Sequence, residues 1–82
     1  MEPSDWHDLI HSDPAILGGK PVVTGTRMAV RFLLDLLAAG STEEQLIENY
    51  PSLTREGLRA ALAFAADRIE EMAFYPVPAE SR

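Results

Sequence analysis

The sequence predicts a mainly α fold in which three helices follow a short β-hairpin segment. Two observations predict it. Apolar residues recur at helical spacing through about 29–72, whereas glycine, proline and β-branched residues are concentrated in about 9–28. Because the chain has 82 residues, we expect one domain, with 73–82 forming a short tail.

The N-terminal segment alternates short apolar runs with turn formers. Val22-Val23 lies between Gly18-Gly19 and Gly25, a pattern typical of two or three short strands joined by turns. Gly18-Gly19 is a candidate hairpin turn, since glycine adopts positive φ without steric cost. A lone hairpin is marginal in water. We therefore expect the segment to pack on the helices, or to pair with a second chain through the Val22-Val23 edge.

The first helix is predicted from about Ala29 to Ala39. Val30, Leu33 and Leu37 recur at helical spacing and form its apolar face. Gly40 then ends the helix, because a residue just past a helix end adopts the left-handed conformation that glycine tolerates.

The second helix is predicted to begin at Ser41, which could form a capping box with Glu44. It extends to about Tyr50, and Pro51 stops it. Thr54 is the expected N-cap of a third helix that continues to about residue 72. The helix runs through Leu58, Ala61, Leu62, Ala65 and Ile69, and its Leu58–Leu62 side is predicted to be buried.

The last two predicted helices and the turn at 51–54 form a helix-turn-helix skeleton, and the preceding helix makes the unit homeodomain-like. Such units insert the first turns of the third helix into the DNA major groove. Arg55 and Arg59 share one helix face and could bind guanine or phosphate. The candidate DNA-binding residues are Ser52, Thr54, Arg55, Glu56, Arg59 and, from the N-terminal segment, Lys20. The alternative is a plain three-helix bundle with solvated arginines.

Composition narrows the classes of function. The net charge is −6, but the acidic excess lies toward the two ends and the centre is near neutral. This distribution suits a centre that meets phosphate, and it suits equally a soluble protein with solvated termini. No cysteine is present, and no apolar run approaches the roughly 20 residues that span a membrane. We expect a cytoplasmic protein that gains stability by self-association.

Nothing in the sequence predicts an enzyme, a metal or a cofactor. His7 and His11 are four residues apart, but a two-histidine pair falls short of a closed metal site. Lys20 follows Gly18-Gly19 without the spacing or the hydroxyl residue of a P-loop. The acidic residues form no pair suited to acid–base catalysis.

The predicted tail contains Phe74, Tyr75 and Val77 between prolines. Aromatic residues in an extended segment could anchor in a groove of a partner protein. They could equally fold back over the helices or over Trp6, which is itself expected to cover the core.

A longer motif adds a family resemblance. The run Asp13-Pro14-Ala15-Ile16-Leu17-Gly18-Gly19-Lys20-Pro21-Val22-Val23-Thr24-Gly25-Thr26-Arg27 resembles the signature of a small prokaryotic family known as domain of unknown function four hundred and thirty-three. Later segments resemble the family too: 34–41, Glu43-Glu44, Tyr50-Pro51, Leu53-Thr54 and 60–66. In total the resemblance covers roughly residues 9–68.

The family is similar to VapB-type antitoxins with a homeodomain-like fold. The resemblance implies an antitoxin that neutralises a PIN-type ribonuclease toxin and represses its own operon as a homodimer on operator DNA. The short tail departs from the long tails of many antitoxins, so the third helix could contact the toxin instead. A stand-alone DNA-binding regulator and an interaction module without a nucleic-acid role are the alternatives. Within the motif, Arg27 is expected to tie the hairpin to the helices through backbone carbonyls, Asp13 or Asp35.

Overall fold

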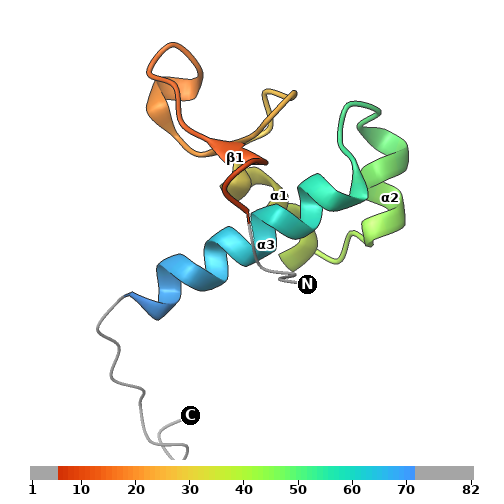
Figure 1. Cartoon of the computed structure of the whole chain (residues 1–82). Coiled ribbons are helices and arrows are strands. Elements are labelled where there is room, and N and C mark those ends of the chain that lie inside the picture. Colours follow the sequence, from red (N-terminus) through yellow and green to blue (C-terminus); the bar gives the residue numbers. More distant parts are fainter. Residues whose placement is uncertain (1–5, 72–82) are drawn as a thin grey trace, which may run out of the picture.

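The computed structural model describes residues 6–71 and contains three α-helices and a two-stranded sheet (Figure 1). In chain order the elements are β1 (Ile10–His11), the 3-10 helix η1 (Leu17–Gly19), β2 (Val22–Val23), α1 (Val30–Ala38), α2 (Glu43–Asn49) and α3 (Arg55–Glu70). The mainly α fold with an N-terminal strand pair is confirmed.

The two strands are antiparallel, with Ile10 opposite Val23 and His11 opposite Val22. The second edge of β2 is also occupied, because Val22 forms an antiparallel bridge with Ala29. The Val30 N–H donates to the Pro21 carbonyl there at 2.9 Å. The prediction that the Val22-Val23 edge pairs with a second chain is therefore wrong, because the start of α1 fills that edge.

Gly18-Gly19 does not form a tight hairpin turn. It lies in η1, within the longer connection 12–21 between the paired strands. Leu17, Gly18 and Gly19 all have positive φ, at 52°, 66° and 87°. The expected glycine conformation is present, but it folds a wide loop.

The capping box lies one residue later than predicted. The Thr42 hydroxyl accepts from the Gln45 N–H at 3.1 Å, and the Gln45 side chain accepts from the Thr42 N–H at 2.8 Å. The predicted box at Ser41 cannot close, because the Ser41 N–H that the Glu44 side chain would need donates to the Leu36 carbonyl at 3.0 Å. That bond belongs to a Schellman motif around Gly40, which has φ of 107° and ends α1 as predicted.

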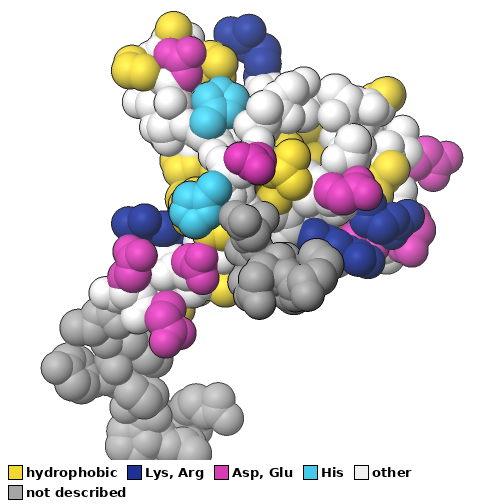
Figure 2. All heavy atoms as spheres, viewed as in Figure 1, with side chains coloured by type: hydrophobic (Ala, Val, Ile, Leu, Met, Phe, Trp, Pro, Cys, Tyr) yellow, Lys and Arg dark blue, Asp and Glu magenta, His cyan; other side chains and the backbone are white. Residues whose placement is uncertain are grey.

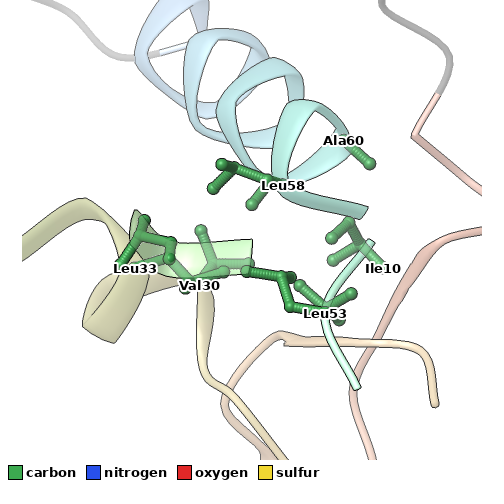
Figure 3. Close-up of a cluster of buried hydrophobic side chains, with 9 residues drawn as sticks. Ile10, Val30, Leu33, Leu53, Leu58 and Ala60 are labelled. Carbon is green, nitrogen blue, oxygen red and sulfur yellow. The ribbon is translucent and has the colours of Figure 1, made fainter. Parts of the chain in front are cut away.

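The core lies where the first half of α3 meets the sheet and α1. Leu58 and Ala60 of α3 lie against Val30 and Leu33 of α1 and Ile10 of β1 (Figure 3). The full set of buried apolar residues is Ile10, Val22, Val23, Val30, Leu33, Leu46, Leu53, Leu58, Ala60 and Ala61. Thr54 caps α3 as predicted, accepting from the Gly57 N–H at 2.9 Å.

The second half of α3 extends beyond the elements that cover its first half (Figure 1). As a result Leu62 is 43% exposed and Ile69 is 64% exposed, so the prediction that the buried side includes Leu62 is wrong. Trp6 packs on the core as expected. Its indole N–H donates to Asp67 at 2.5 Å, and its ring meets Phe64 edge to face at 4.8 Å.

Gly57 is buried at the closest approach between α3 and β2. A Cβ at this position would lie 2.9 Å from Val23 Cγ1 and 3.2 Å from Thr54 Oγ1. Alanine would favour the helix by about 1 kcal/mol on propensity alone, but Val23 is 2% exposed and its short side chain has no free space to move into. Glycine is therefore required here by packing.

We predict that Gly57→Ala lowers the free energy of unfolding by about 1–3 kcal/mol, because overpacking a close contact outweighs the gain in propensity. Urea denaturation followed by circular dichroism measures the change. Val23→Ala removes the opposing methyl groups and should recover part of the loss when combined with Gly57→Ala. A stabilised Gly57→Ala variant would show that the two elements are not in tight contact.

Candidate functional site

The exposed arginines of α3 converge on one carboxylate of α2. Arg55 Nη1 lies 2.5 Å from Glu43 Oε1, and Arg59 Nε lies 3.2 Å from Glu43 Oε2. Lys or Arg side chains lie beside Asp or Glu side chains over this end of the molecule (Figure 2). We call the group Arg55, Arg59 and Glu43 the α3 arginine cluster. The sequence pattern placed the two arginines on one face but missed Glu43, which lies 12 residues before Arg55 and 16 before Arg59 and is brought beside them only by the fold.

The two guanidinium groups change the acidity of Glu43. Its pKa is held below the ordinary value of 4.5, chiefly by the hydrogen bond from Arg59 and further by the positive charges of Arg59 and Arg55. The guanidinium groups remain accessible, because the Arg55 and Arg59 side chains are 46% and 65% exposed. Contact with an anion is therefore sterically open, although Glu43 already offsets part of the positive charge.

The other candidate DNA-binding residues divide between two places. Ser52 and Glu56 are exposed beside the start of α3. The hydroxyl oxygen of Thr54 accepts from the Gly57 N–H, and its own O–H stays available as a donor. Lys20 is not part of this group, because it lines a pocket on another surface.

That pocket has a volume of about 550 Å³ and lies between the N-terminal loops, the start of α1 and the end of α2. Its wall is mainly apolar, with two cationic side chains. The lining residues are Leu17, Lys20, Arg27, Met28, Ala29, Phe32 and Tyr50. We call it the Lys20–Arg27 pocket. The sequence offered one signal for it, since these are the two cations of the segment 9–28.

Arg27 does not make the contacts expected of it. Asp35 pairs with Arg31 at 3.0 Å, and Asp13 accepts from the Ala15 N–H at 2.9 Å. Arg27 is exposed and lines the pocket instead. The prediction that it ties the hairpin to the helices through these carboxylates is wrong, because each has a nearer partner along the chain.

His7 and His11, the histidines considered as metal ligands, are not part of a metal-binding cluster among the described residues. Across residues 6–71 there is no group of three or more His, Cys, Asp or Glu residues that could hold a metal ion. His7 stacks on Trp6 with ring centroids 4.2 Å apart, and His11 Nδ1 lies 3.0 Å from Thr24 Oγ1.

Within residues 6–71, no helix has the length and apolar character needed to cross a membrane. The partner-binding candidates Phe74, Tyr75 and Val77 lie outside the described residues.

The described residues form a small, mainly α fold with an N-terminal strand pair. Residues 10–65 match the family described as "Protein of unknown function (DUF433)". The chain therefore belongs to the DUF433 family.

Two relatives extend this result. The chain is 43% identical over 58 residues to the uncharacterized protein y4eO of Sinorhizobium fredii, in a match that covers 71% of this chain and 26% of that protein. It therefore spans about a quarter of this relative. A crystal structure of a DUF433 member from Anabaena variabilis superimposes with a TM-score of 0.71 at 32% identity. That match covers 77% of this chain and 62% of the Anabaena chain.

The lowered pKa of Glu43 predicts an acid-sensitive contribution to stability. A carboxylate with a depressed folded-state pKa stabilises the fold above its unfolded value near 4.5 and loses that contribution as the pH falls through the folded pKa. The difference in stability between the natural chain and Glu43→Gln should therefore be present at neutral pH and shrink below pH 4.5.

Urea midpoints measured between neutral pH and the acid range provide the test. Glu48→Gln is the matched control, because Glu48 is exposed on the same helix and has no ion pair among residues 6–71. A Glu43→Gln difference that stays constant through the acid range would show that the arginines do not hold this carboxylate in solution.

Proposed function

We propose that this chain is a non-enzymatic, DNA-binding helix-turn-helix protein that acts as the antitoxin of a toxin–antitoxin pair and as a dimeric repressor of its own operon. The geometry of α2, the connection and α3 is the observation that supports DNA binding best. A seven-residue helix is followed by a short connection and a sixteen-residue helix. Arg55 and Arg59 stand exposed on the first turns of that second helix, where a helix-turn-helix protein contacts DNA.

The local electrostatics at the start of α3 add support. The N-terminal end of a helix attracts anions through its free backbone N–H groups and its dipole. Thr54 satisfies one of these groups, at Gly57, and leaves those nearer the helix start to meet a phosphate. Two guanidinium groups within one helical turn could then grip the same stretch of DNA backbone.

Neutralisation of a PIN-type ribonuclease toxin rests on the family resemblance to VapB-type antitoxins. Phe74, Tyr75 and Val77 remain the proposed contacts in the tail. The exposed Leu62 and Ile69 offer the third helix as a second surface for the toxin or for a second copy, because large exposed apolar side chains are typical of interfaces.

One observation favours a different function. Glu43 occupies both arginines in a chain whose net charge is −6, and an acidic surface repels DNA. A protein-interaction module without a nucleic-acid role is therefore the second candidate. In that case the arginine cluster joins α2 to α3 and meets no phosphate.

We predict that Arg55→Gln/Arg59→Gln weakens binding to duplex DNA from the protein's own promoter by about tenfold or more. The slope of log affinity against log salt should also fall by roughly 2, because two phosphate contacts are lost. Arg31→Gln/Arg68→Gln is the matched control. Each of these arginines forms an exposed ion pair with a neighbour on its own helix, Arg31 on α1 and Arg68 at the end of α3. Fluorescence anisotropy at several salt concentrations separates the two variants. Equal affinities for both variants and the natural chain would reject the arginine face.

We further predict that Glu43→Gln tightens binding to the same DNA and steepens its salt dependence, because the arginines are released from their carboxylate. The interaction-module alternative predicts no DNA binding by either protein. Co-expression with the product of the neighbouring gene tests the antitoxin role separately. Rescue of growth supports it, whereas DNA binding without rescue leaves a stand-alone regulator.

A further inference from the structure

We propose that the Lys20–Arg27 pocket binds a small organic anion with a flat apolar body, of the class of aromatic carboxylates. This site is separate from the proposed DNA-binding face and does not depend on it. The shape of the pocket, the charges at its wall and the backbone that presents them favour such a ligand.

The volume and wall of the pocket suit such a ligand. About 550 Å³ is within the range of sites for small molecules, which combine an apolar lining with a few polar groups. Phe32 and Tyr50 meet edge to face, with ring centroids 5.9 Å apart, and provide an aromatic wall. Met28 adds an adaptable side chain, and Ala29 leaves space beside it. Leu17 and Phe32 remain 47% and 42% exposed, so an apolar ligand would cover surface that now faces water.

The charges of the described residues select an anion. Four of the arginines in 6–71 each form an ion pair with a carboxylate: Arg31, Arg55, Arg59 and Arg68. Lys20 and Arg27 are the remaining Lys and Arg residues of that range, and neither side chain has a hydrogen bond or an ion pair within it. Both line the pocket. In a chain with more than enough acidic residues to pair every cation, the two left without a carboxylate flank the same apolar space.

The backbone beside the pocket is held in an unusual conformation. Leu17 has φ of 52°, a left-handed conformation that is costly for a residue with a branched side chain and is found often at ligand sites. The Gly19 N–H donates to the Ile16 carbonyl at 3.1 Å, and the Lys20 N–H donates to the Leu17 carbonyl at 3.3 Å. These bonds close a turn that directs Leu17 and Lys20 to the pocket. An anion could pair with Lys20 and Arg27 while its ring lies against Phe32 and Leu17.

The test uses 1-naphthoate as the probe and 1-naphthalenemethanol as its neutral counterpart. The full chain labelled with nitrogen-15 is titrated with each compound, and its backbone amide shifts are followed by NMR. We expect saturable shifts at Leu17, Lys20, Met28 and Phe32 with naphthoate, and binding at least tenfold weaker with the neutral compound. Lys20→Gln/Arg27→Gln should weaken naphthoate binding by a similar factor, and naphthoate should raise the melting temperature of the natural chain.

Arg31→Gln/Arg68→Gln again serves as the matched control and should bind naphthoate like the natural chain. Because Lys20 and Arg27 are exposed, their replacement should leave the circular dichroism spectrum unchanged, so lost binding reports on the site. Three results would each overturn the proposal: no saturable shifts at millimolar naphthoate, equal binding of the neutral compound, or naphthoate binding that survives Lys20→Gln/Arg27→Gln. None of these results bears on the DNA-binding test, which uses other residues and another ligand.

Discussion

The close contact between the start of α3 and strand β2 is the constraint on which the rest of the structure depends. Gly57 lets the helix approach Val23 so nearly that a Cβ would lie 2.9 Å from its Cγ1. Leu58, Ala60 and Ala61 then bury against the sheet and α1. Small residues on this stretch of α3 bring three elements together, and a sheet of two short strands gains the covering that it needs to persist in water. A larger side chain at residue 57 would separate the very elements that form the core.

This packing also positions both candidate surfaces. The buried face of α3 leaves Arg55 and Arg59 on the opposite face, where α2 brings Glu43 to them. The bridge between Val22 and Ala29 joins the end of the N-terminal segment to the start of α1, which places Arg27, Ala29 and Phe32 around one pocket. The arginine cluster and the pocket differ in one physical respect. In the α3 arginine cluster the cations are already paired with the Glu43 carboxylate. In the Lys20–Arg27 pocket the cations lie beside an apolar wall that has no carboxylate.

Local signals in the sequence were reliable wherever one residue decides its own backbone geometry. Gly40 and Thr54 end and begin their helices as expected, because a left-handed residue and a side-chain cap act within one turn. The predicted box at Ser41 failed by one residue, since the Schellman motif of α1 uses the Ser41 N–H first. The predicted burial of Leu62 failed for a tertiary reason. Helical spacing predicts which side of α3 is apolar. How much of that side is buried depends on where the elements that pack against it end.

By itself the sequence determined the mainly α class, the order of the elements, most helix ends and the membership of a family suggested by the motif through Arg27. These depend on hydrophobic spacing, turn residues and capping, which operate over a few neighbouring residues. Only the tertiary structure decided that Glu43 pairs with Arg55 and Arg59, that the outer edge of β2 is filled by Ala29, and that Lys20 and Arg27 share a pocket with Phe32 and Tyr50. These contacts join residues that are brought together by packing, and local sequence patterns do not predict which surfaces will come into contact.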